Sequence, residues 1–110
     1  MQKVKNAVIK KTILNQAKQY IKACNKMNIP VRKAILFGSQ VNGKANKYSD
    51  IDLLIVSSRF KENSLENWKL LSPVTARFYR IEPHPYPVKN FISGDPFIEE
   101  IKKYGVEIEI

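Results

Sequence analysis

The sequence is poor in cysteine and has no long apolar run, and both absences narrow the kind of protein it encodes. Cys24 is the single cysteine among 110 residues, so a disulfide within the chain is excluded. No apolar run approaches the ~20 residues of a membrane-spanning helix. The first residues, MQKVKNAVIKK, lack the apolar core of a signal peptide. We therefore expect a cytoplasmic protein that does not span a membrane.

Acidic residues are also scarce. The chain has 10 Asp and Glu against 19 Lys and Arg, which gives a formal net charge of +9. This balance suits a polyanionic partner, an acidic protein surface or a phosphorylated substrate, although a lysine-rich solvated surface explains it equally well. The positive residues are spread along the chain instead of forming one basic block, which weakens the case for a dedicated nucleic-acid binder.

The hydrophobic periodicity predicts one mixed α/β domain that spans residues 1–110. The predicted elements, in order, are a helix over 4–27, strands over 31–37 and 50–57, a helix beginning near 63, a strand over 77–85, a helix over 96–104 and a strand over 106–110. Asp95-Pro96 is typical of a helix start and Gly105 of a helix end. Ser72-Pro73 is expected either to break the helix after residue 63 or to begin a second short one.

Four aromatic residues, Trp68, Phe78, Phe91 and Phe97, are expected in the core, with a partner interface as the alternative. In the helix that begins near residue 63, Trp68 is spaced with Leu65 and Leu71 to form an apolar face.

A Gly-Ser pair ends the first predicted strand. Gly38 has no Cβ, so phosphate oxygens can approach its backbone closely. Ser39 adds a hydroxyl, and free N–H groups at a helix start attract anions. A plain turn is the alternative, because Gly-Ser is a common turn pair.

Two aspartates begin the next strand. Residues i and i+2 of a strand face the same side, so Asp50 and Asp52 are expected to project together. Adjacent carboxylates repel unless a cation lies between them, and Mg²⁺ favours carboxylate oxygens together with substrate phosphates. The alternative is one aspartate that caps a turn and one that is solvated.

Glu82 is a candidate third acidic ligand. It stands between Ile81 and Pro83 in a strand that is otherwise apolar or basic, and a carboxylate there is costly unless it is paired or metal-bound. A salt bridge to Arg77 or Arg80 is the alternative. With a phosphate-binding elbow and an aspartate pair, such a ligand would complete a site for a nucleoside triphosphate and two ions.

The stretch GSQVNGKANKYSDIDLLIV resembles the signature of the DNA polymerase beta-type nucleotidyltransferases. The following RIEPHPY is similar to the minimal nucleotidyltransferases, small prokaryotic proteins often paired with HEPN-domain partners. The resemblance implies a nucleotidyltransferase fold, an α+β arrangement in which a mixed sheet is flanked by helices. It also implies transfer of a nucleoside monophosphate from ATP to a hydroxyl with release of pyrophosphate.

By this resemblance Asp50, Asp52 and Glu82 are the catalytic residues and bind two Mg²⁺ ions. The nucleotide-binding residues that it implies are Gly38, Ser39, Lys44 and Ser49. Many relatives carry an arginine where this chain has Asn42, so one possible phosphate contact is absent. Lys44 and Lys47 lie close enough in sequence to replace it, and solvated loop lysines are the alternative. His84 could touch the nucleotide, although a His between two prolines is more often structural.

The acceptor is the remaining question. Only 28 residues follow Glu82 in this sequence, too few for a second domain that would hold the acceptor. Similar minimal proteins are antitoxins that adenylylate and bind a HEPN-type toxin, and we expect that activity here. A small-molecule or RNA acceptor and a non-catalytic partner-binding module are the alternatives. The sequence is compatible with any oligomeric state.

Overall fold

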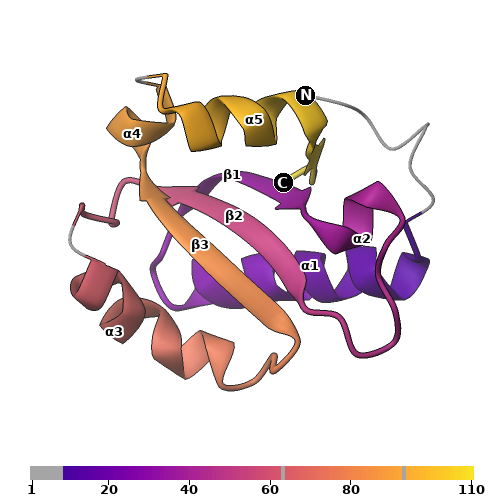
Figure 1. Cartoon of the computed structure of the whole chain (residues 1–110). Helices are drawn as coiled ribbons and strands as arrows, with labels where there is room; N and C mark the ends of the chain where they lie inside the picture. The colour runs from indigo at the N-terminus through magenta and orange to yellow at the C-terminus, as the bar shows by residue number, and fades with distance from the viewer. Residues whose placement is uncertain (1–8, 63, 93) are drawn as a thin grey trace.

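The computed structural model of the chain describes residues 9–62, 64–92 and 94–110 (Figure 1). The predicted helices and strands follow in the predicted order, with two further short helices over 39–42 and 88–92. The elements are α1 (Lys11–Lys26), β1 (Val31–Phe37), α2 (Ser39–Asn42), β2 (Ile51–Ser57), α3 (Ser64–Thr75), β3 (Ile81–Pro87), α4 (Val88–Ile92), α5 (Pro96–Tyr104) and β4 (Val106–Glu107). The predicted α+β fold class is therefore confirmed.

The sheet is mixed, with strand order β3-β2-β1-β4. Strand β1 runs antiparallel to both β2 and β4, whereas β2 and β3 are parallel and are joined by α3. A parallel pair needs a crossover connection, usually a helix, and α3 supplies it. This pairing brings the start of β2, the start of β3 and the end of β1 to one end of the sheet.

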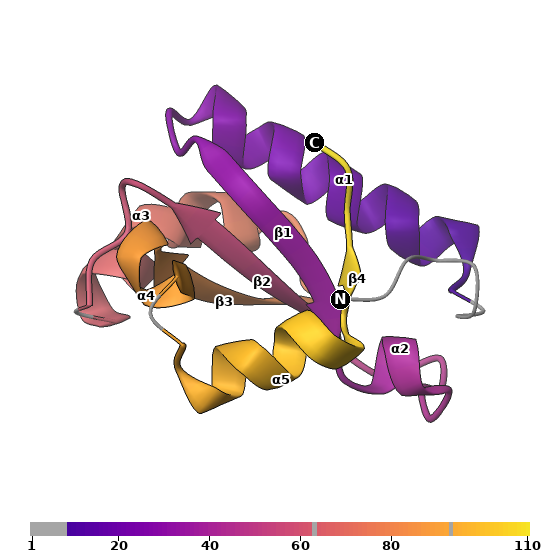
Figure 2. The same ribbon diagram turned by 90° about the horizontal axis from the view of Figure 1, so that it is seen from above.

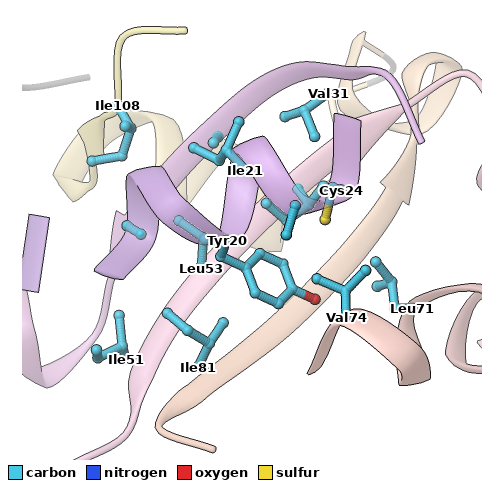
Figure 3. Close-up of a cluster of buried hydrophobic side chains, with 14 of the residues drawn as sticks. Tyr20, Ile21, Cys24, Val31, Ile51, Leu53, Leu71, Val74, Ile81 and Ile108 are labelled. Atoms are coloured by element: carbon cyan, nitrogen blue, oxygen red, sulfur yellow. The ribbon is translucent and has the colours of Figure 1, made fainter. Parts of the chain in front are cut away.

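One face of the sheet packs against α1 and α3 (Figures 1 and 2). Helix α1 buries an apolar stripe at helical spacing, and Tyr20 at its centre lies against strand and α3 side chains (Figure 3). The Tyr20 hydroxyl forms a 2.8 Å hydrogen bond with Thr75 Oγ1, which satisfies the polar end of a fully buried ring. This side of the sheet holds the larger core.

The opposite face packs against α5 (Figure 2). The side chains of β2 alternate between the two faces of the sheet, as the sequence predicts. Leu54 and Val56 face α5, whereas the residues between and before them face the larger core. Ile98 and Ile101 of α5 complete this smaller core. The face that α5 covers is the one on which Asp52 lies.

Helix α5 begins and ends where the sequence predicts. Asp95 Oδ1 accepts hydrogen bonds from the Phe97 and Ile98 N–H groups, at 2.8 and 3.4 Å, and Pro96 occupies the first turn. Gly105 ends the helix in extended backbone, at φ −77° and ψ 170°. Its role is close packing, because a Cβ there would lie 2.5 Å from Ile35 Cγ2.

Several predicted boundaries need correction. The first helix begins at Lys11, since residues 9 and 10 are not helical, and the predicted part over 4–8 lies outside the described residues. The predicted helix start at Asn63 also lies outside them. The strand predicted over 77–85 begins only at Ile81, because residues 76–80 form a turn after α3. Pro73 neither breaks α3 nor starts a new helix but lies inside it.

The predicted apolar face of α3 is also partly wrong. Leu71 and Val74 are buried, but Leu65 and Trp68 are exposed, at 59% and 48%. The side of α3 that faces the core carries both apolar and polar residues. Asn67 is buried there, and its side chain forms hydrogen bonds with the N–H and the carbonyl of Lys61. Of the other aromatics, Phe78 and Phe91 are partly buried against the two cores, whereas Phe97 is 39% exposed.

Strand β3 is an edge of the sheet and carries a proline at every second position. Pro83, Pro85 and Pro87 lie opposite Leu53, Ile55 and Ser57 of β2 without a break in register. Proline has no N–H to donate, so its backbone nitrogen is tolerated where it faces away from the neighbouring strand. These prolines therefore occupy the outward-facing positions of the edge.

We expect the protein to lose stability above about pH 9, because two acidic groups are buried in the larger core. Burial raises the pKa of the Cys24 thiol to about 12 and also raises the pKa of the Tyr20 hydroxyl. Alkali ionises the exposed thiol of the unfolded chain first, so the unfolded state releases a proton that the folded state retains. The stability contribution of Cys24 is therefore complete below pH 8–9 and is lost as pH rises toward 12.

Urea unfolding between pH 7 and 11 measures this loss. Cys24→Ala should show a shallower decline of the free energy of unfolding with pH, by up to ~1.4 kcal/mol per pH unit. Parallel curves for the two proteins would contradict the assignment.

None of the helices that the structure describes is long and apolar enough to cross a membrane.

Candidate active site

Three neighbouring strands place the candidate site residues in one row. Asp52, the second residue of β2, is the register partner of Phe37 on β1 and of Glu82 on β3. Paired residues of adjacent strands project from the same face of a sheet. The predicted meeting of an aspartate with Glu82 thus follows from the pairing of β2 with β3.

His84 joins the two carboxylates. It lies two residues after Glu82 on β3 and so faces the same side. Its Nε2 atom is 3.3 Å from Asp52 Oδ1 and 3.9 Å from Glu82 Oε1. Ligand atoms of the three residues all lie within 4.8 Å of one another. Two carboxylates and an imidazole at this separation are a donor set that fits a divalent cation.

Gly38 closes the other side of the site. Its backbone has φ 77° and ψ −149°, a region that is essentially restricted to glycine. A Cβ at this position would lie 2.5 Å from Asp52 Oδ2, so the glycine leaves room for that carboxylate. The Gly38 carbonyl accepts the Val41 and Asn42 N–H groups, which holds the single turn of α2 directly after the elbow. The predicted proximity of the Gly-Ser elbow to the acidic residues is therefore present.

The site is negatively charged and its groups influence one another. The pKa of Glu82 is raised, first by partial burial and then by the charge of Asp52, with a smaller contribution from Asp50, whereas His84 lowers it. Half of the Glu82 side chain is exposed, so solvent screens this repulsion. A cation between the carboxylates would relieve it.

Asp50 lies outside the cluster that Asp52, Glu82 and His84 form. It lies one residue before β2 begins and is exposed, and among the described residues it is not part of the cluster whose ligand atoms meet within 4.8 Å. Its charge still reaches Glu82. Of the predicted trio, the structure brings Asp52 and Glu82 together, adds His84 to them and leaves Asp50 at the margin.

The predicted nucleotide-binding residues after the elbow form a loop that is held from several sides. The Ser49 hydroxyl accepts the Asn46 N–H at 2.9 Å, so Ser49 helps to close this loop. The Ser49 carbonyl accepts from Arg80 Nη2 at 2.9 Å and from Gln40 Nε2 at 3.4 Å. Arg80, which the sequence suggested as a salt-bridge partner of Glu82, thus anchors the strand that leads into the site.

The cationic side chains of this region face outward. Lys44 is exposed, and its N–H donates to Asn42 Oδ1 at 3.0 Å. Lys47 is also exposed and lies over the Tyr48 ring. Ser39 lines a hollow of about 230 Å³ that also includes Lys10, Lys47 and Arg80.

Two further hollows flank the carboxylates. One, of about 370 Å³, adjoins Gly38 and is mainly apolar, with Phe37 and Phe97 in its wall. The other, of about 480 Å³, is more polar and includes Glu82, His84 and the exposed Trp68. The acidic row therefore lies between two cavities of different chemistry.

Two side chains, His84 and Phe97, lie closer to the acidic residues than their sequence patterns indicate. His84 was recognised only as a minor candidate, although its i+2 spacing from Glu82 on a strand was the signal that placed both on one face. Phe97 was assigned to the core, and no local pattern reveals that α5 brings it beside Phe37, at a ring separation of 5.8 Å.

Comparison with known proteins identifies the domain family and the fold. The family model described as a nucleotidyltransferase domain matches residues 17–108. No curated protein matches the chain. A crystal structure from Sulfolobus solfataricus, described as that of a candidate nucleotidyltransferase, has a similar fold: the TM-score is 0.66 at 19% identity, over 87% of this chain and 78% of that one. From the family match over most of its length, the chain belongs to the nucleotidyltransferase domain family.

Proposed function

We propose that this protein transfers the nucleoside monophosphate of ATP to a hydroxyl group on a partner protein of the HEPN-domain type, in a Mg²⁺-dependent reaction. The family supports nucleotidyl transfer and a nucleoside triphosphate substrate in general. The observation that carries the proposal is the pairing of Asp52 with Glu82 across β2 and β3, next to the Gly38 elbow.

In this proposal Asp52 and Glu82 hold the metal, with Asp50 at the margin of the site. Bound Mg²⁺ would neutralise charge on the triphosphate and on the reacting oxygens. His84, within hydrogen-bond reach of Asp52, fixes the orientation of that carboxylate. Most of the catalytic effect then comes from positioning and from preorganised charge.

The chemical step is a displacement at the α-phosphorus. The acceptor hydroxyl oxygen forms a bond to this phosphorus, the bond from the phosphorus to the β-bridging oxygen breaks, and pyrophosphate leaves with the electron pair. We assign the hydroxyl proton to the Glu82 carboxylate.

The triphosphate is assigned to the side of Gly38 and Ser39. Gly38 permits close approach to the backbone. In this proposal Ser49 and the exposed Lys44, both on the loop that follows α2, also contact the triphosphate. In this arrangement Lys44 supplies the positive charge that the arginine of many relatives would provide at Asn42.

The acceptor is assigned to the polar hollow. This hollow opens beside Glu82, the proposed base, and its wall includes Trp68, a large apolar side chain that is 48% exposed. Tryptophan is enriched among the residues that contribute most of the binding energy in protein–protein interfaces. With the resemblance to the minimal nucleotidyltransferases, this surface favours a protein acceptor.

An RNA hydroxyl is the second candidate acceptor. Among the described residues, the wall of the hollow behind α2 includes Lys10, Lys47 and Arg80 and no acidic side chain. The whole chain carries a formal charge of +9. Cations of this kind bind phosphate backbones with a strong dependence on salt concentration.

One labelling experiment tests both acceptors. The purified protein is incubated with Mg²⁺ and ATP labelled at the α-phosphate, together with HEPN-domain proteins in one arm and with RNA at low salt in the other. We expect label and an AMP mass increment on the protein partner, and no label when Glu82→Gln replaces the wild type. Label on RNA alone would show that RNA, not the protein partner, is the acceptor. ATP that stays intact in both arms would contradict catalysis by this chain.

A further inference from the structure

The mainly apolar hollow beside Gly38 has no role in the metal chemistry. It encloses about 370 Å³, within the range of small-molecule sites. Its wall combines the apolar and aromatic residues Phe37, Val41, Phe97, Ile101 and Tyr104 with two polar residues, Asn42 and Glu100. A mainly apolar wall with a few polar groups is the usual composition of a site for a flat organic ligand.

The hollow adjoins the acidic row at Phe37 and Gly38. Phe37 lies in its wall and is the register partner of Asp52, and the Phe37 ring is 4.8 Å from that of His84. Gly38 is in the same wall and lies against Asp52. A ligand in the hollow therefore lies next to the place assigned to the triphosphate.

Phe97 offers an exposed aromatic surface at a fixed position. It is 39% exposed, although its ring is held edge-on to Phe37 at 5.8 Å and stacked with Tyr86 at 6.2 Å. Its backbone N–H is bonded to the Asp95 cap, which fixes the first turn of α5. An aromatic ring that is held in place by its neighbours and is still partly exposed is suited to stack against a planar ligand.

We propose that this hollow binds the base of the nucleoside triphosphate, with Phe97 as the stacking residue. This inference rests on the proposed function, because it takes the triphosphate to lie at Gly38. A purine is the favoured ligand class because its larger ring gains more from stacking. Phe97 is then a residue that determines affinity for the nucleoside portion and leaves the phosphate contacts unchanged.

Calorimetric titration with two probes, ATP and inorganic triphosphate, in Mg²⁺ buffer tests the inference. Wild type should bind ATP more tightly than inorganic triphosphate. In Phe97→Ala the dissociation constant for ATP should rise about 5- to 100-fold, the range for loss of base stacking, whereas that for inorganic triphosphate should stay unchanged. Comparing the two probes within each variant cancels the phosphate contribution.

Phe97→Leu keeps apolar packing against Phe37 without a stacking face, so it serves if the alanine variant does not fold, and it should give the same selective loss. Tyr79→Ala is the matched control, since this tyrosine is 91% exposed and is not in the wall of the hollow. If the Phe97 variants change the affinity for both probes equally, or leave the affinity for ATP unchanged, the assignment of the base to this hollow is wrong, whereas the proposed function still stands. A wild type that binds neither probe would overturn the proposed function as well.

Discussion

Asp52→Asn should reduce the rate of nucleotidyl transfer by on the order of 10³-fold while the protein stays folded. The reason is that Asp52 lies next to each of the other residues of the candidate site. It contacts His84, lies opposite Glu82 in register and occupies the space that Gly38 leaves open. The amide has nearly the same shape, so packing is retained and only the charge is lost. Rates are measured by release of labelled pyrophosphate at saturating ATP.

Thermal unfolding of the same variant separates a catalytic from a structural effect. Because the charge of Asp52 raises the pKa of Glu82, its removal relieves repulsion, and the Tm without Mg²⁺ should stay equal or rise slightly. Glu99→Gln is the control: it removes an exposed carboxylate that pairs with Lys102 on α5, outside the site, and should leave transfer unchanged. A large fall in Tm for Asp52→Asn, or comparable loss in both variants, would contradict the role of Asp52.

Gly38→Ala should have the second largest effect, on activity and stability together. The backbone conformation at this position costs roughly 1–3 kcal/mol for a residue with a Cβ, which corresponds to a fall in Tm of about 5–15 °C. The new methyl group would also lie 2.5 Å from Asp52 Oδ2 and must displace that carboxylate. Since a shift of ~1 Å in a catalytic group can cost ~10²-fold in rate, we expect a loss of that order.

Gly43→Ala is the matched control for the backbone contribution. Gly43 also has positive φ, at 81°, but a Cβ there meets no atom within 4 Å. We therefore expect it to destabilise the protein by roughly 1–2 kcal/mol without a comparable loss of transfer. If the two alanine variants lose activity equally, displacement of Asp52 is not the cause.

Much of the fold could be predicted because it follows from short-range patterns. The alternation in β2 correctly assigns Leu54 and Val56 to one face, and the Asp95-Pro96 pair correctly marks the start of α5. The predicted apolar face of α3 is partly wrong. Leu65 and Trp68 have the spacing of an apolar face, but the helix is oriented so that Leu71 and Val74 are buried and these two residues are exposed. Tertiary packing, not spacing, selects which of two apolar stripes is buried.

The candidate site was predictable to the extent that it depends on strand register. Asp52 and Glu82 are brought together by the parallel pairing of β2 with β3. Asp50 lies one residue before β2 begins, where the i+2 rule no longer fixes the face of the sheet on which a side chain lies. The contribution of α5 was also hidden, since Phe97 reaches Phe37 across 60 residues of sequence through the packing of a helix on the sheet.

The alternating prolines of β3 have a consequence for how other chains can associate with this protein. An exposed sheet edge normally offers a ladder of donors and acceptors to which a foreign strand can add. With Pro83, Pro85 and Pro87 at the outward-facing positions, this edge presents carbonyl acceptors but lacks the matching donors. Self-templated growth into fibrils is therefore disfavoured along this border. A companion protein that approaches the catalytic side must dock through its side chains, not by extending the sheet.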